Sequence, residues 1–390
     1  MKKSLIALLL PACCAGQVAA SGVPAATHFL VTNDDVQRQD PPSTVSFFAI
    51  GQDGALAGPD PVSTGGNGMA GGFFGIDRLV IVVNRDEACV FASNAQSENI
   101  AGFDVRERKL TGLFKGTVDD IKLARAGVGL ARGGDYLYAT FSGSGNIAAF
   151  RMRPGCKLDF SGEVHAGGLS GGIAEGLAIR GKLMVVTYGD GSLGSFDVSN
   201  GLPVAHDDMR YAPGVREDFN PGAVDITRDG HYAIFGGGAT QTEVQVADIS
   251  SGRLATPTVY KLGPAWGAGS VRLSPDERLL YVSNSAGGRV TAAFFDKSTG
   301  KLKKGCTSAP LKGFYKSFTY IGAVATELPS GSGGLLYVPE FDSHGGSRIG
   351  ILRLGWSNGG CSLSETMDSP ARGSSGAALL SIGVYPPRPF

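Results

Sequence analysis

The chain has 390 residues with 35 basic and 35 acidic side chains, so its formal net charge at pH 7 is zero. That balance gives no electrostatic basis for binding nucleic acid or an anionic membrane surface. Glycine contributes 60 residues, well above average usage, and lies mostly between predicted strands, which indicates many tight turns rather than disorder.

Residues 1–20 have the pattern of a signal peptide. Two lysines precede a short apolar run, and residues 18–20 form a small-residue cleavage site before Ser21. The run is too short to span a bilayer, and no later stretch is long and apolar enough to be a transmembrane segment. We therefore expect a soluble periplasmic or secreted protein. Lipidation at Cys13 is the alternative, and Pro11 fits that pattern poorly.

From residue 28 onward the sequence repeats one β unit. The clearest copy is Val271–Gly305, where VRL, LLYVSN, RVTAAFF and KLKKG are four short strands separated by turn residues. Second strands recur at steps of 47, 47, 49 and 47 residues, beginning at Cys89, Tyr136, Leu183, Tyr232 and Leu279. Looser copies begin at His28 and Leu335, which makes seven. Such a period, with four strands per copy, is typical of a β-propeller.

The two ends of the repeat array predict how the ring closes. The first copy begins at its second strand, and the last copy is followed by a spare strand, ALLSIGVY. We predict that Ala377–Tyr385 pairs with the strand containing His28–Thr32, because this leaves no open sheet edge at the seam. The predicted fold is all-β: residues 21–390 form one seven-bladed β-propeller, with four antiparallel strands per blade and a C-terminal strand closing the first.

Four cysteines remain after the leader and its two cysteines are removed. An even number in an oxidising compartment indicates disulfides. The two pairs of neighbouring blades favour the pairings Cys89–Cys156 and Cys306–Cys361, and four buried free thiols are the alternative. There is no C-x-x-C motif, so the sequence predicts no zinc or redox site. It identifies no cofactor.

The repeat sequences resemble those of the lactonase-type seven-bladed propellers. The segments that carry the resemblance are SPDERLLYVSN, GGDYLYATFSGSGNIAAF and the third strands NIAGF and NIAAF. This superfamily includes the 6-phosphogluconolactonase-like proteins and the YVTN repeat proteins. The resemblance implies a propeller whose ligand binds at the central channel. Enzymatic members typically carry a histidine just before an innermost strand, whereas the corresponding segments NPGAVDIT, GAGSVRLS and IAEGLAIR contain none.

Candidate site residues follow from propeller geometry. The loops that enter the innermost strands and those that join second to third strands lie on one face, around the channel mouth. Glu175 lies among small and apolar residues in such a loop, where partial burial favours the protonated carboxyl and suits general acid–base chemistry. We predict Glu175 as the acid–base group and Arg216 as the group that orients an anionic substrate. The predicted substrate-binding residues are Tyr188, Asp190, Glu217, Trp266, Asn284, Glu340 and His344. Asp34 and Asn94 belong to the same class of loop.

Two local motifs match catalytic patterns without the context that those patterns need. Gly168–Gly172 matches the G-x-S-x-G elbow, which requires a strand before it and a helix after it. Gly189–Gly194 matches G-x-G-x-x-G but leads into another predicted strand, so there is no helix N-terminus for a pyrophosphate. We predict that both matches are accidental.

Two functions of different classes remain open. The first is an exported lactonase-like hydrolase acting on a small sugar lactone or related ester. The second is a non-catalytic exported propeller that binds a protein or an extracellular ligand, since fold alone does not fix function. In both cases we expect a monomer whose ligand binds at the channel mouth.

Overall fold

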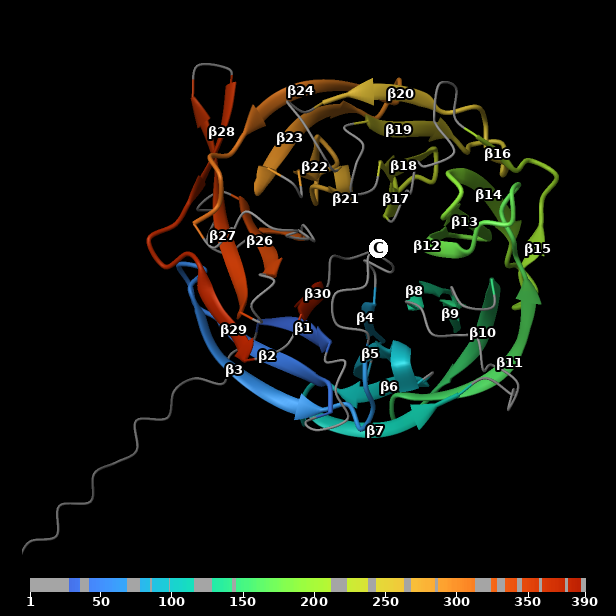
Figure 1. Cartoon of the computed structure of the whole chain (residues 1–390), viewed down its shortest axis with the longest axis horizontal. Helices are drawn as coiled ribbons and strands as arrows, with labels where there is room; N and C mark the ends of the chain where they lie inside the picture. The colour runs from blue at the N-terminus through green and yellow to red at the C-terminus, as the bar shows by residue number, and fades with distance from the viewer. Residues whose placement is uncertain are drawn as a thin grey trace, which may run out of the picture.

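The computed structural model describes residues 28–35, 42–68, 78–84, 86–97, 99–115, 128–141, 145–211, 223–237, 243–262, 268–284, 287–312, 324–327, 334–341, 346–357, 360–375 and 378–386. Their strands form seven antiparallel sheets, which stand around a common axis as the blades of a propeller (Figure 1). The predicted fold is confirmed. We number the blades 1 to 7 in chain order and give their strands from the axis outward.

The first four blades run from the N-terminal seam to the middle of the chain. Blade 1 contains β30 (Ala378–Tyr385), β1 (Phe29–Asp35), β2 (Thr44–Ile50) and β3 (Leu56–Ser63). Blade 2 contains β4 (Leu79–Val83), β5 (Ala88–Asn94), β6 (Asn99–Asp104) and β7 (Lys109–Phe114). Blade 3 contains β8 (Val128–Gly133), β9 (Tyr136–Phe141), β10 (Asn146–Arg153) and β11 (Lys157–His165). Blade 4 contains β12 (Ala174–Arg180), β13 (Leu183–Tyr188), β14 (Ser192–Asp197), β15 (Val204–Ala205) and β16 (Arg210–Tyr211).

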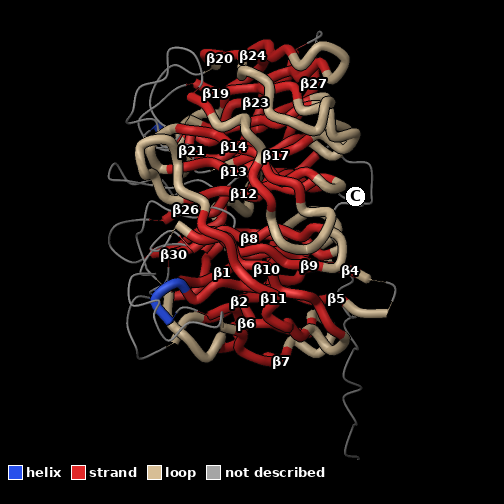
Figure 2. The backbone as a smooth tube through the Cα atoms, turned by 90° about the vertical axis from the view of Figure 1, so that its right-hand side faces the viewer, coloured by secondary structure: helices blue, strands red, loops and turns tan. Residues whose placement is uncertain are grey.

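The remaining three blades complete the ring. Blade 5 contains β17 (Val224–Ile226), β18 (Tyr232–Gly236), β19 (Glu243–Asp248) and β20 (Thr258–Lys261). Blade 6 contains β21 (Ala268–Leu273), β22 (Leu279–Asn284), β23 (Arg289–Asp296) and β24 (Lys301–Thr307). Blade 7 contains β25 (Val324–Glu327), β26 (Gly334–Phe341), β27 (Gly346–Ser357), β28 (Gly360–Glu365) and β29 (Ala371–Ser375). The one complete helical turn in the described part of the chain is η1 (Ala95–Ser97), drawn in blue at the lower left of Figure 2.

Ring closure follows the prediction. β30 is the innermost strand of blade 1 and pairs antiparallel with β1, from Phe29 opposite Tyr385 to Asp35 opposite Ala378. The two ends of the chain therefore share one sheet, and Figure 1 shows β30 beside β1. No helix in the described part of the chain is long and apolar enough to cross a membrane.

Two blades differ from the four-strand pattern at their outer edge. In blade 4, β15 and β16 both pair with β14, and the chain between them leaves the sheet. There the buried carboxylate of Asp208 accepts the Ser195 amide at 3.1 Å and the Leu254 amide at 2.7 Å. In blade 7, β28 and β29 both pair with β27, and Pro370, which lacks an amide hydrogen, stands between them.

The hydrophobic core is divided among the clefts between neighbouring blades. Alternate residues of each second strand face opposite clefts, as the two-residue period of a strand requires. In β5, Val90 packs with blade 1 residues and Phe91 with blade 3 residues. Each blade therefore buries both faces, and the cleft that a side chain enters depends on its parity along the strand.

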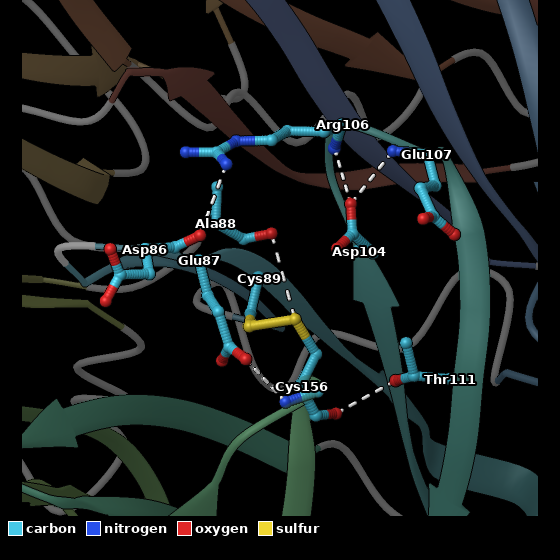
Figure 3. The surroundings of a disulfide bond; sticks show 10 residues. Asp86, Glu87, Ala88, Cys89, Asp104, Arg106, Glu107, Thr111 and Cys156 are labelled. Carbon is cyan, nitrogen blue, oxygen red and sulfur yellow. Dashed lines mark hydrogen bonds between the residues drawn. A yellow bond between two sulfur atoms is a disulfide. The ribbon is translucent and has the colours of Figure 1, made fainter.

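Two disulfides join neighbouring blades, in the pairing that the sequence favours. Cys89–Cys156 links blade 2 to blade 3, and Cys306–Cys361 links blade 6 to blade 7, with Cα–Cα distances of 5.4 and 5.5 Å. Around the first bridge the carbonyl of Cys156 accepts from Thr111 Oγ1 at 2.9 Å (Figure 3). These bonds exclude the alternative of four free thiols for this structure.

Candidate functional site

The first and third strands of a blade begin at the same end of the disc, where the second strands finish. This end is the predicted channel mouth. Blade 4 has both of its loops at this end within the described residues: the segment before β12 and the short turn Gly189–Gly191 between β13 and β14.

Asp190 joins the two blade 4 loops. Its Oδ2 accepts the amides of Ser170 at 2.7 Å and Gly172 at 3.3 Å. Its Oδ1 accepts the Ser192 amide at 2.9 Å and hydroxyl at 2.5 Å. Burial alone would raise the pKa of Asp190, but hydrogen bonds from Ser192, Ser170 and Gly172 outweigh it and lower the pKa below the usual value. Asp190 thus holds the two loops together, and its role in substrate binding stays a prediction.

The same contacts explain the G-x-S-x-G match. The segment is a closed turn in which the Gly168 amide donates to the Gly172 carbonyl at 2.7 Å. A Cβ on Gly168 or Gly172 would lie within 2.7 Å of the Asp190 carboxylate, so both glycines make room for that group. The Ser170 hydroxyl lies 2.7 Å from the Tyr211 hydroxyl. Neither this segment nor Gly189–Gly194, which runs into β14, leads into a helix, so both matches are accidental.

Glu175 is the second residue of β12 and is more deeply buried than predicted, with 1% of its surface exposed. It lies in a bulge, because the pairing of β12 with β13 shifts register between Ala174 and Leu177. Its carbonyl accepts from Thr140 Oγ1 of blade 3 at 2.9 Å. A Cβ on Gly189 would lie 2.8 Å from Oε1 of Glu175, so the carboxyl packs against a glycine. The bond from Thr140 and the close contact with Gly189 thus hold Glu175 from the two sides.

Five other candidate residues occupy equivalent places in their blades. Asp34, Asn94, Tyr188, Asn284 and Glu340 each lie at or next to the end of a second strand, and all are buried. By strand parity each side chain points into the cleft toward the preceding blade. Tyr188 joins the core between blades 3 and 4, Asn284 follows Val282 of the core between blades 5 and 6, and Glu340 follows Val338 of the core between blades 6 and 7. The structure therefore places the three predicted ligand contacts Tyr188, Asn284 and Glu340 in three different clefts.

Most of these polar groups are bonded within their own blade. Asn284 Nδ2 donates to Thr291 Oγ1 at 2.9 Å, and Asn94 Nδ2 donates to Asn99 Oδ1 at 2.8 Å. Asp34 accepts from three hydroxyls, those of Thr32, Thr44 and Ser46.

Tyr188 and Glu340 differ from these residues, because the Tyr188 hydroxyl and both Glu340 carboxyl oxygens have no hydrogen-bond partner among the described residues. Burial, with smaller contributions from Asp190 and Asp208, raises the pKa of Tyr188 far above its usual value.

Glu340 is 1% exposed. A Cβ on Gly350 would lie 2.5 Å from its Oε1, so glycine at that position leaves the space that the carboxyl occupies. Burial raises the pKa of Glu340 to about 8; the charge of Glu365 adds to the increase and that of Arg348 opposes it. At neutral pH this carboxyl is mostly protonated.

Four predicted site residues lie outside the described residues: Arg216, Glu217, Trp266 and His344. Their roles remain predictions.

Arg78 is a buried charged residue that the sequence reasoning missed. It directly precedes β4 and is fully buried. Its amide donates to Ser381 Oγ of blade 1 at 2.7 Å, and its carbonyl accepts the Ser93 amide at 3.0 Å. By strand register, the equivalent residues in blades 3 and 4 are Gly129 and Gly176. An alignment of the repeats could have shown this residue, because a large cation stands where the neighbouring copies have glycine.

A serine, a histidine and an aspartate also meet in blade 4. Ser195 Oγ lies 2.9 Å from His206 Nδ1 and donates to Asp208. In a hydrolase triad the acid orients the imidazole, whereas here both groups contact the serine. Ser195 is buried, and Asp208 also accepts the Leu254 amide. This cluster holds the outer edge of blade 4 against blade 5.

Comparison with known proteins supports the fold. No protein-family model matches the chain, and no curated protein matches its sequence. A candidate 6-phosphogluconolactonase from Bacteroides uniformis is similar in structure, with a TM-score of 0.67 and 15% identity, over 92% of this chain and 99% of that one. A protein of unknown function from Desulfotomaculum acetoxidans gives a TM-score of 0.63 and 12% identity, over 91% and 98% of the two chains. A second candidate 6-phosphogluconolactonase, from Bacteroides fragilis, gives a TM-score of 0.52 and 16% identity over 71% and 80%. At these identities the similarity establishes the shared propeller fold.

Proposed function

We propose that the chain is an exported lactonase-like hydrolase that opens a small sugar lactone, or a related ester, at the mouth of its central channel. The observation that carries the proposal is the Glu175 carboxyl, which is buried at the start of an innermost strand and packed against Gly189. The fold similarity to two candidate 6-phosphogluconolactonases supports the choice of reaction. The two disulfides suit the oxidising compartment that the signal-peptide pattern of residues 1–20 predicts.

The proposed chemistry needs one acid–base group and one cation. A water oxygen attacks the lactone carbonyl carbon, and the bond from that carbon to the ring oxygen breaks. Glu175 takes a proton from the water and returns it to the departing ring oxygen, so that a hydroxy acid is released. A guanidinium orients an anionic substrate and stabilises the negative charge that develops on the carbonyl oxygen. Arg216 has that role in the proposal, and Arg78 supplies a buried guanidinium at the same end of blade 2.

The test is a panel of sugar lactones, with and without a phosphate or carboxylate group, assayed with the wild type and Glu175→Gln. Removing an acid–base group typically lowers turnover by about 100- to 10,000-fold. We expect that loss with a nearly unchanged melting temperature, since glutamine keeps the size of the side chain. Glu107→Gln, at an exposed turn position, is the matched control and should retain full turnover. Turnover that survives Glu175→Gln would keep the hydrolase but reject this residue.

One observation favours a second function, a non-catalytic propeller that binds a protein or an extracellular ligand. Tyr188, Asn284 and Glu340 enter separate clefts and do not converge on one point. An active site normally brings several polar groups together in one pocket. If the wild type turned over no lactone of the panel above the background rate, the hydrolase would be rejected in favour of this function.

A further inference from the structure

The cleft between blades 6 and 7, here the 6–7 cleft, contains an acid in an apolar setting. Leu336, Val338 and Leu352 of blade 7 pack there against Val290 and Ala292 of blade 6. Glu340 continues the row formed by Leu336 and Val338, two residues further along β26, and lies at the mouth end of the cleft. An ionised carboxylate without a hydrogen bond is strongly disfavoured in such surroundings, whereas the neutral acid is tolerated much better.

The charge of Arg348 opposes the burial of this carboxyl but does not offset it. Arg348 lies opposite Glu340 in the β26–β27 register, and Glu365 lies on β28. The Glu365 carboxylate is already bonded, to the Lys312 amide at 2.9 Å and to Ser369 Oγ at 2.6 Å. Across the cleft, the described titratable or charged side chains that share its face by register are Arg272, Tyr281 and, at the exposed outer edge, Asp296, Lys301 and Lys303. None of these described groups lies within hydrogen-bond distance of the Glu340 carboxyl.

We propose that Glu340 is a proton-controlled lock on the 6–7 cleft, which is closed while its carboxyl is protonated and loosened when that carboxyl ionises. The outer side of the same cleft is fixed covalently, because Cys306 on β24 is bonded to Cys361 on β28. Loosening is therefore confined to the inner strands of the cleft, at the end of β26 where Glu340 lies. The lock makes access to the channel mouth depend on pH, and it does not rest on the proposed hydrolase.

Thermodynamic linkage gives the direction of the effect. In the open cleft water solvates Glu340, so its pKa returns toward the ordinary value near 4.5, whereas burial raises it to about 8 in the closed cleft. Between these values opening releases one proton. The opening equilibrium should therefore rise up to about ten-fold per pH unit, and it should level off above pH 8.

The experiment is amide hydrogen exchange of the full chain, wild type against Glu340→Gln, at pH 5.5 and pH 8. Comparing the two proteins at the same pH cancels the intrinsic exchange rates. By this linkage the wild type should exchange in β26 and β27 about 10-fold faster than Glu340→Gln at pH 5.5. At pH 8 that ratio should be at least about 10-fold larger than at pH 5.5, while blades 2 to 4 remain equal. Glu107→Gln, an exposed carboxylate, should behave as wild type at both values.

Three results would overturn the lock: equal protection at both pH values, a difference spread over all blades, or faster exchange in Glu340→Gln. Should that variant fold poorly, carboxyl carbon NMR of the wild type provides an independent measurement. One glutamate carboxyl carbon should titrate near pH 8, and that titration should be absent only from Glu340 variants. A spectrum in which every glutamate titrates below about pH 6 would reject the proposal.

Discussion

Glycine determines where single carboxyl groups fit in this propeller. Glu175 packs against Gly189, Asp190 against Gly168 and Gly172, and Glu340 against Gly350, and in each case a Cβ would lie 2.8 Å or less from an atom of the carboxyl group. These four glycines thus have a local cause beyond the turns that the sequence indicated. The sequence alone could not separate these glycines from turn glycines, because the acid that each one faces is brought in by strand pairing.

Gly350→Ala tests this relation directly. The added methyl group overlaps the Glu340 carboxyl, and such overpacking typically costs about 1–3 kcal/mol. Urea unfolding should show that loss in the wild-type background and a smaller loss in Glu340→Ala, where the space is vacant. Gly334→Ala is the matched control, since its nearest neighbour atom would be 3.8 Å away. Equal losses in both backgrounds would contradict the contact.

Asp190→Asn should destabilise the fold in a pH-dependent way. The pKa of Asp190 is lowered in the folded state, so the ionised carboxylate contributes stability above the unfolded pKa near 3.8. That contribution is lost as pH falls through the folded pKa. Unfolding in urea should therefore show a loss of about 1–3 kcal/mol at pH 7 that disappears toward pH 2. A loss that is constant over this range would contradict the charge-dependent bonds to Ser170 and Gly172.

At the scale of elements, the strand that closes the ring is the most consequential segment. β30 supplies the innermost strand of blade 1, and its Ser381 hydroxyl also accepts the Arg78 amide of blade 2. Deleting residues from Ala377 onward should expose the β1 edge and cost several kcal/mol through unpaired backbone and lost core. Deleting only residues 386–390 is the control. Thermal unfolding of both truncations checks this, and equal melting temperatures would contradict the closure.

The disulfides also stabilise the arrangement of neighbouring strands. Cys89 and Cys156 are 67 residues apart, so the chain-entropy estimate for their bond is about 4 kcal/mol. Replacing both with serine should lower the free energy of unfolding by about 2–4 kcal/mol, measured in urea without reductant. Thiol titration of the denatured, unreduced mature wild type should find no free thiol. Four titratable thiols would show that neither disulfide forms.

At the scale of the whole molecule, the sequence was sufficient for the architecture. Seven copies spaced by about 47 residues, an incomplete first copy and a spare last strand leave one closed arrangement of the chain. The broken outer strands of blades 4 and 7 were missed, because the Asp208 contact reaches Leu254 of the next blade and because β28 and β29 return to the same strand, β27, on either side of Pro370.

The candidate site was less predictable than the fold. Glu175 and Asp190 lie at one end of blade 4, where the structure joins their two loops, and their roles stay predictions. Tyr188, Asn284 and Glu340 were expected around the channel, yet their parity along the second strands turns them into the clefts. Side chains of a second strand alternate between the clefts on the two sides of their blade, so neither parity faces the channel.

The central claim is that Glu175 performs acid–base chemistry at the channel mouth. Its most direct test is the ratio of kcat/KM between wild type and Glu175→Gln on whichever lactone the wild type opens fastest, with the melting temperatures compared alongside. The account predicts a ratio of about 100 or more and closely matching melting temperatures. A ratio near one, with both proteins folded, would contradict it.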